Sequence, residues 1–152
     1  MFEQADSVDE WLRIARSNRD AAYALVYVPS TRNIAWERAG FAAECVLKAS
    51  IMAKERLNRF PPRALRRDLY DHDLGRLSRT LGMEVMADDD LAPYWQVVLQ
   101  WRREHTYVAG EMPLTVVREL LDAVFSDDGV VPWVCRSYLG SYMTPEQNIW
   151  RR

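Results

Sequence analysis

The residues best suited to chemistry lie together in one short segment, residues 101–107, which reads Trp-Arg-Arg-Glu-His-Thr-Tyr. The candidate catalytic residues in it are Arg102, Arg103, His105 and Tyr107. A histidine can exchange a proton near neutral pH, an arginine can stabilise a pentacoordinate phosphate, and a tyrosine hydroxyl can orient either. These are the residue types of a metal-independent ribonuclease, in which the 2′-hydroxyl of the RNA is the nucleophile. On a helix, Arg102 and His105 would share a face.

Each of the two histidines also has a structural interpretation. His105 would be favourably placed at the C-terminal end of a helix, with Tyr107 packing below it. His72 follows Asp71 and precedes Asp73; either aspartate would accept backbone N–H groups at a helix start, and His72 would hydrogen-bond across the turn. Two histidines are too few for the metal centre of a phosphohydrolase, and glycine-rich phosphate loops are absent. We therefore expect no metal site and no cofactor.

A second candidate site is the basic stretch of residues 54–67, which contains six basic residues and a single acidic one. Its candidate ligand-binding residues are Arg59, Arg63, Arg66 and Arg67. Phe60 and a double proline lie among them, so the stretch could bind a phosphate backbone while the aromatic ring offers stacking. The alternative is a solvated surface loop that pairs with the acidic residues of segment 84–90.

The overall composition favours no anionic partner. The 152-residue chain has 20 basic and 22 acidic residues, a formal charge of −2. Eighteen of the basic residues are arginine, which suits phosphate recognition but is also expected from the codon bias of a GC-rich genome. No apolar run approaches the roughly 20 residues that span a bilayer, and the acidic N-terminus lacks a signal-peptide plan. We expect a cytoplasmic protein without a membrane partner, in which Cys45 and Cys135 are reduced core thiols.

Helical periodicity predicts one all-α domain over residues 1–152, with its core at about 8–139 and a loosely held tail at 144–152. A capping box of Ser7 and Glu10 predicts the start of a first helix, which Pro29 ends. A second helix is expected from about residue 30 to 57, antiparallel to the first. Its predicted inward residues are Ile34, Phe41, Cys45, Leu47 and Ile51. Gly40 interrupts this helix and needs close packing to explain it.

Four shorter helices are expected in the second half of the chain. The first covers residues 73–81 and ends at Gly82. The second begins after three aspartates, residues 88–90, and carries Leu91, Tyr94, Val98 and Trp101. The third is opened by Pro113, with Val116, Val117, Leu120, Leu121 and Val124 facing inward. The last has Pro132 in its first turn.

The order of these features resembles the HEPN superfamily, named for higher eukaryotes and prokaryotes nucleotide-binding. The second helix of that family typically has a small-aromatic-small run leading to Glu-x-x-x-Lys-Ala, and a His-Asp-Leu turn follows. Here residues 39–49 read Ala-Gly-Phe-Ala-Ala-Glu-Cys-Val-Leu-Lys-Ala, and residues 72–74 read His-Asp-Leu. Trp11 and Ala15, with residues 19–22, supply the matching first helix. The resemblance covers about residues 8–139.

This resemblance implies an antiparallel four- to five-helix bundle, here with a short extra C-terminal helix, that usually forms a homodimer. Many members are metal-independent RNases of toxin, anti-phage or RNA-processing systems, with an Arg-x(4–6)-His motif at the dimer cleft. Others lack the motif and bind nucleotides or RNA, or partner a small nucleotidyltransferase. In this chain only two residues separate Arg102 from His105, although His105-Thr106-Tyr107 matches the His-x-Tyr ending of the motif.

We therefore expect a noncatalytic or degenerate member that binds RNA or nucleotide phosphate, as a component of a toxin–antitoxin or nucleotidyltransferase-paired system. Two alternatives stay open. One is a metal-independent RNase that uses Arg102 and His105 at a dimer cleft, and the other is a pure protein-interaction subunit.

Overall fold

A computed structural model describes residues 3–142, and within this range the chain forms helices and no β-strand. The α-helices are α1 (Val8–Leu25), α2 (Arg32–Glu55), α3 (Leu74–Leu81), α4 (Ala92–Val98), α5 (Leu114–Phe125) and α6 (Val130–Tyr138). Short 3-10 helices follow several of them: η1 (Pro29–Thr31), η2 (Arg67–Tyr70), η3 (Arg103–Tyr107) and η4 (Gly140–Tyr142). The predicted all-α bundle with a short C-terminal helix is confirmed. The predicted tail, residues 144–152, lies outside the described residues.

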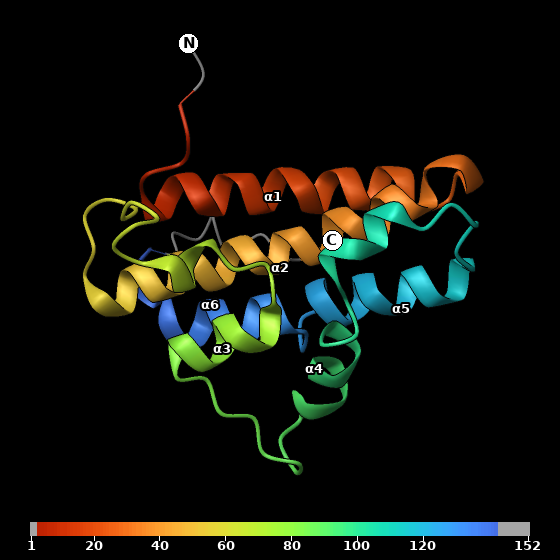
Figure 1. The fold of residues 1–152 in the computed structure, drawn as a ribbon. Helices are drawn as coiled ribbons and strands as arrows, with labels where there is room; N and C mark the ends of the chain where they lie inside the picture. The colour runs from red at the N-terminus through yellow and green to blue at the C-terminus, as the bar shows by residue number, and fades with distance from the viewer. Residues whose placement is uncertain (1–2, 143–152) are drawn as a thin grey trace.

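The central element of the bundle is α2, which packs against α1, α3, α5 and α6. Figure 1 shows α1 running alongside α2 on one side, with α5 and α6 on the other. Every residue from Ala42 to Met52 is buried. A helix covered on all sides has no single apolar stripe, so the five predicted inward positions understate its burial. One of the five is wrong: Ile34, near the exposed start of the helix, is 40% exposed.

Local capping signals place the first helix. The Ser7 hydroxyl accepts a hydrogen bond from the Glu10 backbone N–H (3.1 Å), as predicted. The Glu10 carboxylate reaches one residue further than a capping box requires and accepts from the Asp6 backbone N–H (2.8 Å). Buried Asn18 donates to the Ile14 carbonyl (2.9 Å) and accepts from Arg38 (3.3 Å), so its polar amide is satisfied within the apolar face.

Among the shorter helices, α3 closely matches its predicted bounds, whereas α4 ends earlier than predicted. Asp73 caps α3 by accepting the Arg76 backbone N–H (2.9 Å), and Gly82 ends it with a φ of 80°. α4 ends at Val98, earlier than predicted, so Trp101 lies beyond the helix. In α5, Val116 is 41% exposed rather than inward, because Val117, Leu120, Leu121 and Val124 already define the buried face.

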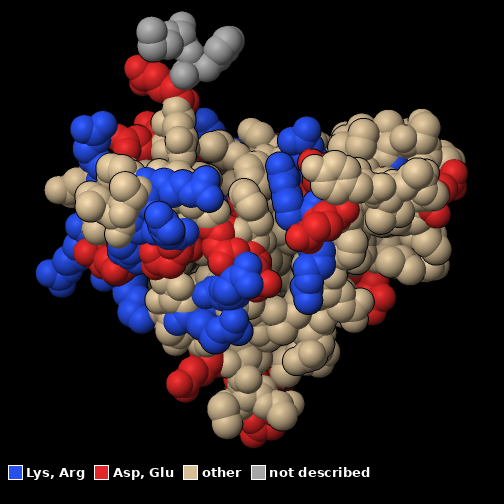
Figure 2. Space-filling model, viewed as in Figure 1, with Lys and Arg blue, Asp and Glu red and all other residues tan. Residues whose placement is uncertain are grey.

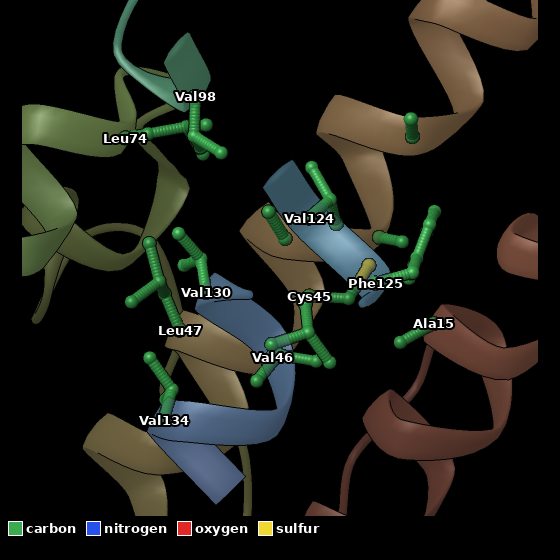
Figure 3. Close-up of a cluster of buried hydrophobic side chains, with 14 of the residues drawn as sticks. Ala15, Cys45, Val46, Leu47, Leu74, Val98, Val124, Phe125, Val130 and Val134 are labelled. Carbon is green, nitrogen blue, oxygen red and sulfur yellow. The ribbon is translucent and has the colours of Figure 1, made fainter. Parts of the chain in front are cut away.

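One cluster of buried apolar side chains includes residues from all six α-helices of the described chain. Figure 3 shows part of it, where Cys45, Val46 and Leu47 of α2 are surrounded by Ala15, Leu74, Val98, Val124, Phe125, Val130 and Val134. Cys45 and Cys135 are both buried, as predicted, and burial raises the pKa of the Cys45 thiol. None of the helices in the described part of the chain is long and apolar enough to span a bilayer.

Candidate functional site

An open groove of about 380 Å³ crosses one face of the bundle. Its lining comes from three segments: Arg63, Arg67 and Tyr70 in and before η2; Asp71, His72, Asp73 and Arg76 at the start of α3; and Arg102, Arg103 and Glu104 at the start of η3. We call it the arginine groove, after Arg63, Arg67, Arg76, Arg102 and Arg103. Figure 2 shows basic side chains gathered on this face, with carboxylates among them. The two candidate sites predicted separately from the sequence therefore meet in one place.

The first wall of the groove belongs to the basic stretch, which divides into two kinds of arginine. Arg66 forms ion pairs with Glu55 (2.9 Å) and Asp68 (2.8 Å), and Arg59 pairs with Asp6 (2.9 Å). These two arginines hold the loop in place and do not line the groove. Arg63 and Arg67 line the groove and are exposed, and their guanidinium groups have no partner among residues 3–142.

The partners of the basic stretch differ from those expected for a solvated loop. Its ion pairs reach Asp6, Glu55 and Asp68, and not the acidic segment 84–90. Asp6 also accepts the Phe60 backbone N–H (3.0 Å), and the Tyr70 hydroxyl donates to the Pro61 carbonyl (2.8 Å). The loop is thus fastened at several points, which leaves Arg63 and Arg67 on a fixed backbone.

The second wall of the groove is anchored by Trp101. Its buried ring fills the space beside Gly40 of α2, where an added Cβ would lie 2.1 Å from the ring. This close approach explains the glycine inside α2. The Arg102 side chain then donates to the carbonyls of Leu99 (2.5 Å) and Trp101 (3.0 Å), just beyond α4, and Arg103 lies 3.8 Å from Glu37. Both arginines remain exposed at the groove.

His105 lies behind this wall. Its Nδ1 accepts hydrogen bonds from the Trp36 indole N–H (2.9 Å) and from the Arg102 backbone N–H (3.2 Å). The Nδ1 lone pair is therefore engaged by the protein, and in the neutral ring the proton is on Nε2. The prediction that the side chains of Arg102 and His105 share a helix face is wrong, because Arg102 precedes a 3-10 helix and contacts the His105 ring through its backbone N–H.

His105 and Tyr107 do not line the groove. The segment is a 3-10 helix that follows α4 rather than the end of that helix. The alternative in which Tyr107 packs below His105 is wrong, because Tyr107 is 84% exposed.

His72 lines the groove and has a partner that sequence reasoning missed. Its Nδ1 lies 3.0 Å from Oε1 of Glu44 in α2, so the prediction of a hydrogen bond across its own turn is wrong. Glu44 is 1% exposed, and its second oxygen accepts from Lys48 (3.1 Å), which is also buried. A buried carboxylate needs donors on both oxygens, and His72 supplies the second one. The sequence does contain a signal for a buried polar contact here, because Glu44 and Lys48 are opposite charges one turn apart in an otherwise apolar stretch.

The acidic residues of the groove are partly committed to structural contacts. Asp71 is paired with Arg76 through both carboxylate oxygens (2.5 and 3.0 Å), which lowers the pKa of Asp71. Asp73 caps α3. No set of three potential metal ligands occurs within residues 3–142.

The arrangement suits an anion that bridges the two walls. The planar fork of a guanidinium binds phosphate or carboxylate through two parallel hydrogen bonds, and Arg63 and Arg67 have these donors unused. Tyr70 adds an aromatic ring to the same lining. Comparisons of the chain with protein-family models, with curated proteins and with solved structures give no match.

Proposed function

We propose that this chain is a noncatalytic, HEPN-like domain that binds RNA or nucleotide phosphate in the arginine groove. The observation that carries the proposal is the convergence of Arg63 and Arg67 with Arg102 and Arg103. These pairs are far apart in the sequence and meet on one surface. Each of the four is exposed, and Arg63 and Arg67 have no anionic partner in the described chain.

Several features favour a phosphate ligand over a single carboxylate. Arginines on two walls offer more donors than one carboxylate accepts, and the open shape admits an extended chain. The Tyr70 ring offers a surface on which a base can stack. Because the net charge of the chain is −2, binding should depend on this local group of charges and weaken strongly with salt.

The HEPN-like part of the proposal is supported by the order of the sequence features and by the all-α bundle. Homodimer formation and membership of a toxin–antitoxin or nucleotidyltransferase-paired system belong to the same proposal. The RNase alternative has less support, because His105 uses Nδ1 to accept two hydrogen bonds and does not line the groove. A pure interaction subunit stays the second alternative, and absence of RNA binding would favour it.

A fluorescently labelled oligouridylate tests the proposal. Binding is followed by anisotropy at low salt in EDTA, and the RNA is then examined on a denaturing gel. We expect saturable binding and intact RNA. Absence of binding would overturn the proposal. Cleavage that His105→Ala abolishes would replace it with the RNase alternative.

A further inference from the structure

His72 is a titratable side chain of the arginine groove that the proposed function does not yet use. Its side chain is 51% exposed, and it shares the groove lining with Arg63, Arg67, Arg102 and Arg103. Unlike His105, it lines the groove, and the protein engages only one of its ring nitrogens. The other nitrogen is therefore available to a ligand.

The contact with Glu44 determines which nitrogen that is. A carboxylate only accepts hydrogen bonds, so Nδ1 of His72 carries the proton that it donates to Oε1 of Glu44. Nε2 lies on the opposite edge of the ring, away from Glu44. In the neutral ring Nε2 presents a lone pair, which repels a phosphate oxygen. In the protonated ring it presents an N–H, which a phosphate oxygen accepts.

The buried pair beneath His72 fixes the orientation of the ring. Glu44 and Lys48 are one turn apart in α2, 1% and 4% exposed, and the Lys48 ammonium also lies 5.6 Å from the centre of the Trp11 ring. Burial of the pair on a packed helix leaves Glu44 little freedom to move. A hydrogen bond from a rigid carboxylate holds an imidazole in one tautomer and one orientation, as it does for histidines that bind metals or transfer protons.

We propose that His72 contacts the phosphate of the bound ligand through Nε2–H, and that Glu44 is its positioning residue, so that binding is coupled to uptake of a proton. This inference depends on the proposed function, since it places His72 in the same groove. By linkage, a ligand that favours the protonated ring binds more tightly as the pH falls.

The other charged groups around His72 determine the direction of this coupling. Without a ligand, the arginines at 63, 67, 76, 102 and 103 oppose a further positive charge in the groove. A bound phosphate neutralises them and removes that opposition. Asp73 and Glu104 add negative charge to the same lining, and Asp71 is already paired with Arg76. Lys48 faces the far side of Glu44 and is offset by it.

The test compares the same substitution at both histidines. His72→Asn keeps a donor near Glu44 and removes Nε2, whereas His105→Asn keeps an acceptor for Trp36 and changes a histidine outside the groove lining. The probe is an oligouridylate with hydroxyl ends, because its phosphodiesters keep one charge each over the pH range used. Affinity is measured by anisotropy from about pH 8 to about pH 5.5, where imidazoles commonly titrate.

For the unmodified chain and for His105→Asn we expect the affinity to rise about tenfold across this range, the effect of one charge-assisted hydrogen bond. For His72→Asn we expect a rise of less than about twofold. Calorimetry in two buffers of different ionisation enthalpy should show proton uptake on binding that His72→Asn removes. An equal pH dependence in His72→Asn and the unmodified chain would overturn the inference.

The role of Glu44 needs a variant that does not leave a buried charge alone, since breaking a buried pair is strongly destabilising. Glu44→Gln combined with Lys48→Met removes both charges together. In this double variant we expect RNA binding at about pH 8 to be retained and the rise toward low pH to fall to about twofold. A full tenfold rise in the double variant would show that Glu44 does not position His72.

The two proposals fail in different ways. If the unmodified chain binds no oligouridylate at any pH, the proposed function fails. If it binds, and loses affinity when Arg63 and Arg67 are replaced, but its pH dependence survives His72→Asn, only the role of His72 fails.

Discussion

At the scale of single residues, the contact between Gly40 and Trp101 determines where the second wall of the arginine groove lies. The Trp101 ring occupies the place where any other residue at position 40 would put its Cβ. Arg102 and Arg103 follow directly in the chain, so the position of the ring also sets theirs. One glycine in the middle of a helix thus links the core to the site.

We predict that Gly40→Ala lowers the free energy of unfolding by about 1–3 kcal/mol, the usual cost of forcing a methyl group into a packed interior. RNA affinity should fall as well, because the wall moves. The control is Gly110→Ala, since a Cβ at position 110 meets nothing within 4 Å. Denaturant unfolding of both variants measures the effect. Equal stability of the two variants would contradict the account of Gly40.

The cysteines give a second prediction at this scale. Burial raises the pKa of the Cys45 thiol, and Cys135 is buried as well. Since the thiolate is the reactive form, we expect a thiol reagent at neutral pH to modify neither cysteine in the native chain and both after unfolding. The absorbance change of the reagent, measured in buffer and in guanidinium chloride, gives the number of cysteines that react in the native and in the unfolded chain. Fast reaction of a native thiol would show that the core opens there.

At the scale of elements, the loop before α3 is held by ion pairs between aspartate and arginine. Arg59 lowers the pKa of Asp6, Arg66 lowers that of Asp68, and Arg76 lowers that of Asp71. A carboxyl group whose pKa is lower in the folded chain stabilises the fold above its unfolded pKa, about 3.9 for aspartate. That stabilisation is lost as the pH falls through the lower, folded value.

We therefore predict that the midpoint of thermal unfolding is steady near neutral pH and drops below about pH 4. Replacing Asp6, Asp68 and Asp71 together by asparagine should lower the midpoint near pH 6 and reduce the further drop in acid. Asp88→Asn, which changes an exposed aspartate outside the loop, should leave the profile unchanged. The same acid drop in the triple variant would mean that other carboxyl groups cause it.

Elements with local signals could be predicted from the sequence, and elements placed by distant contacts could not. Ser7, Asp73 and Gly82 act within a few residues of themselves, and each marks the helix boundary expected. The end of α4 has no such local signal, because Trp101 continues the apolar spacing although its ring packs against Gly40 of α2. The pairing of His72 with Glu44 likewise required knowing which part of α2 passes under the turn.

At the scale of the whole molecule, the arginine groove shows why net charge misleads. A formal charge of −2 suggests no anionic partner, yet the fold brings arginines from separated segments to one face. The ion pairs that the basic stretch forms within residues 3–142 do not involve the acidic segment 84–90. The sequence alone identifies Arg63, Arg67, Arg102 and Arg103 as candidate site residues. Their convergence was not predictable, because it depends on how the loop before α3 and the start of η3 pack on α2.

The salt dependence of RNA affinity tests the central claim most directly. Two variants lose the same charge: Arg63→Gln with Arg67→Gln inside the groove, and Arg13→Gln with Arg118→Gln at exposed positions outside its lining. Each lost phosphate contact should lower the slope of log affinity against log salt by about 0.7. We expect the groove variant to bind about tenfold more weakly at low salt with a slope reduced by about 1.4, and the outer variant to match the unmodified chain. Equal losses in the two variants, or no loss in the groove variant, would contradict the account.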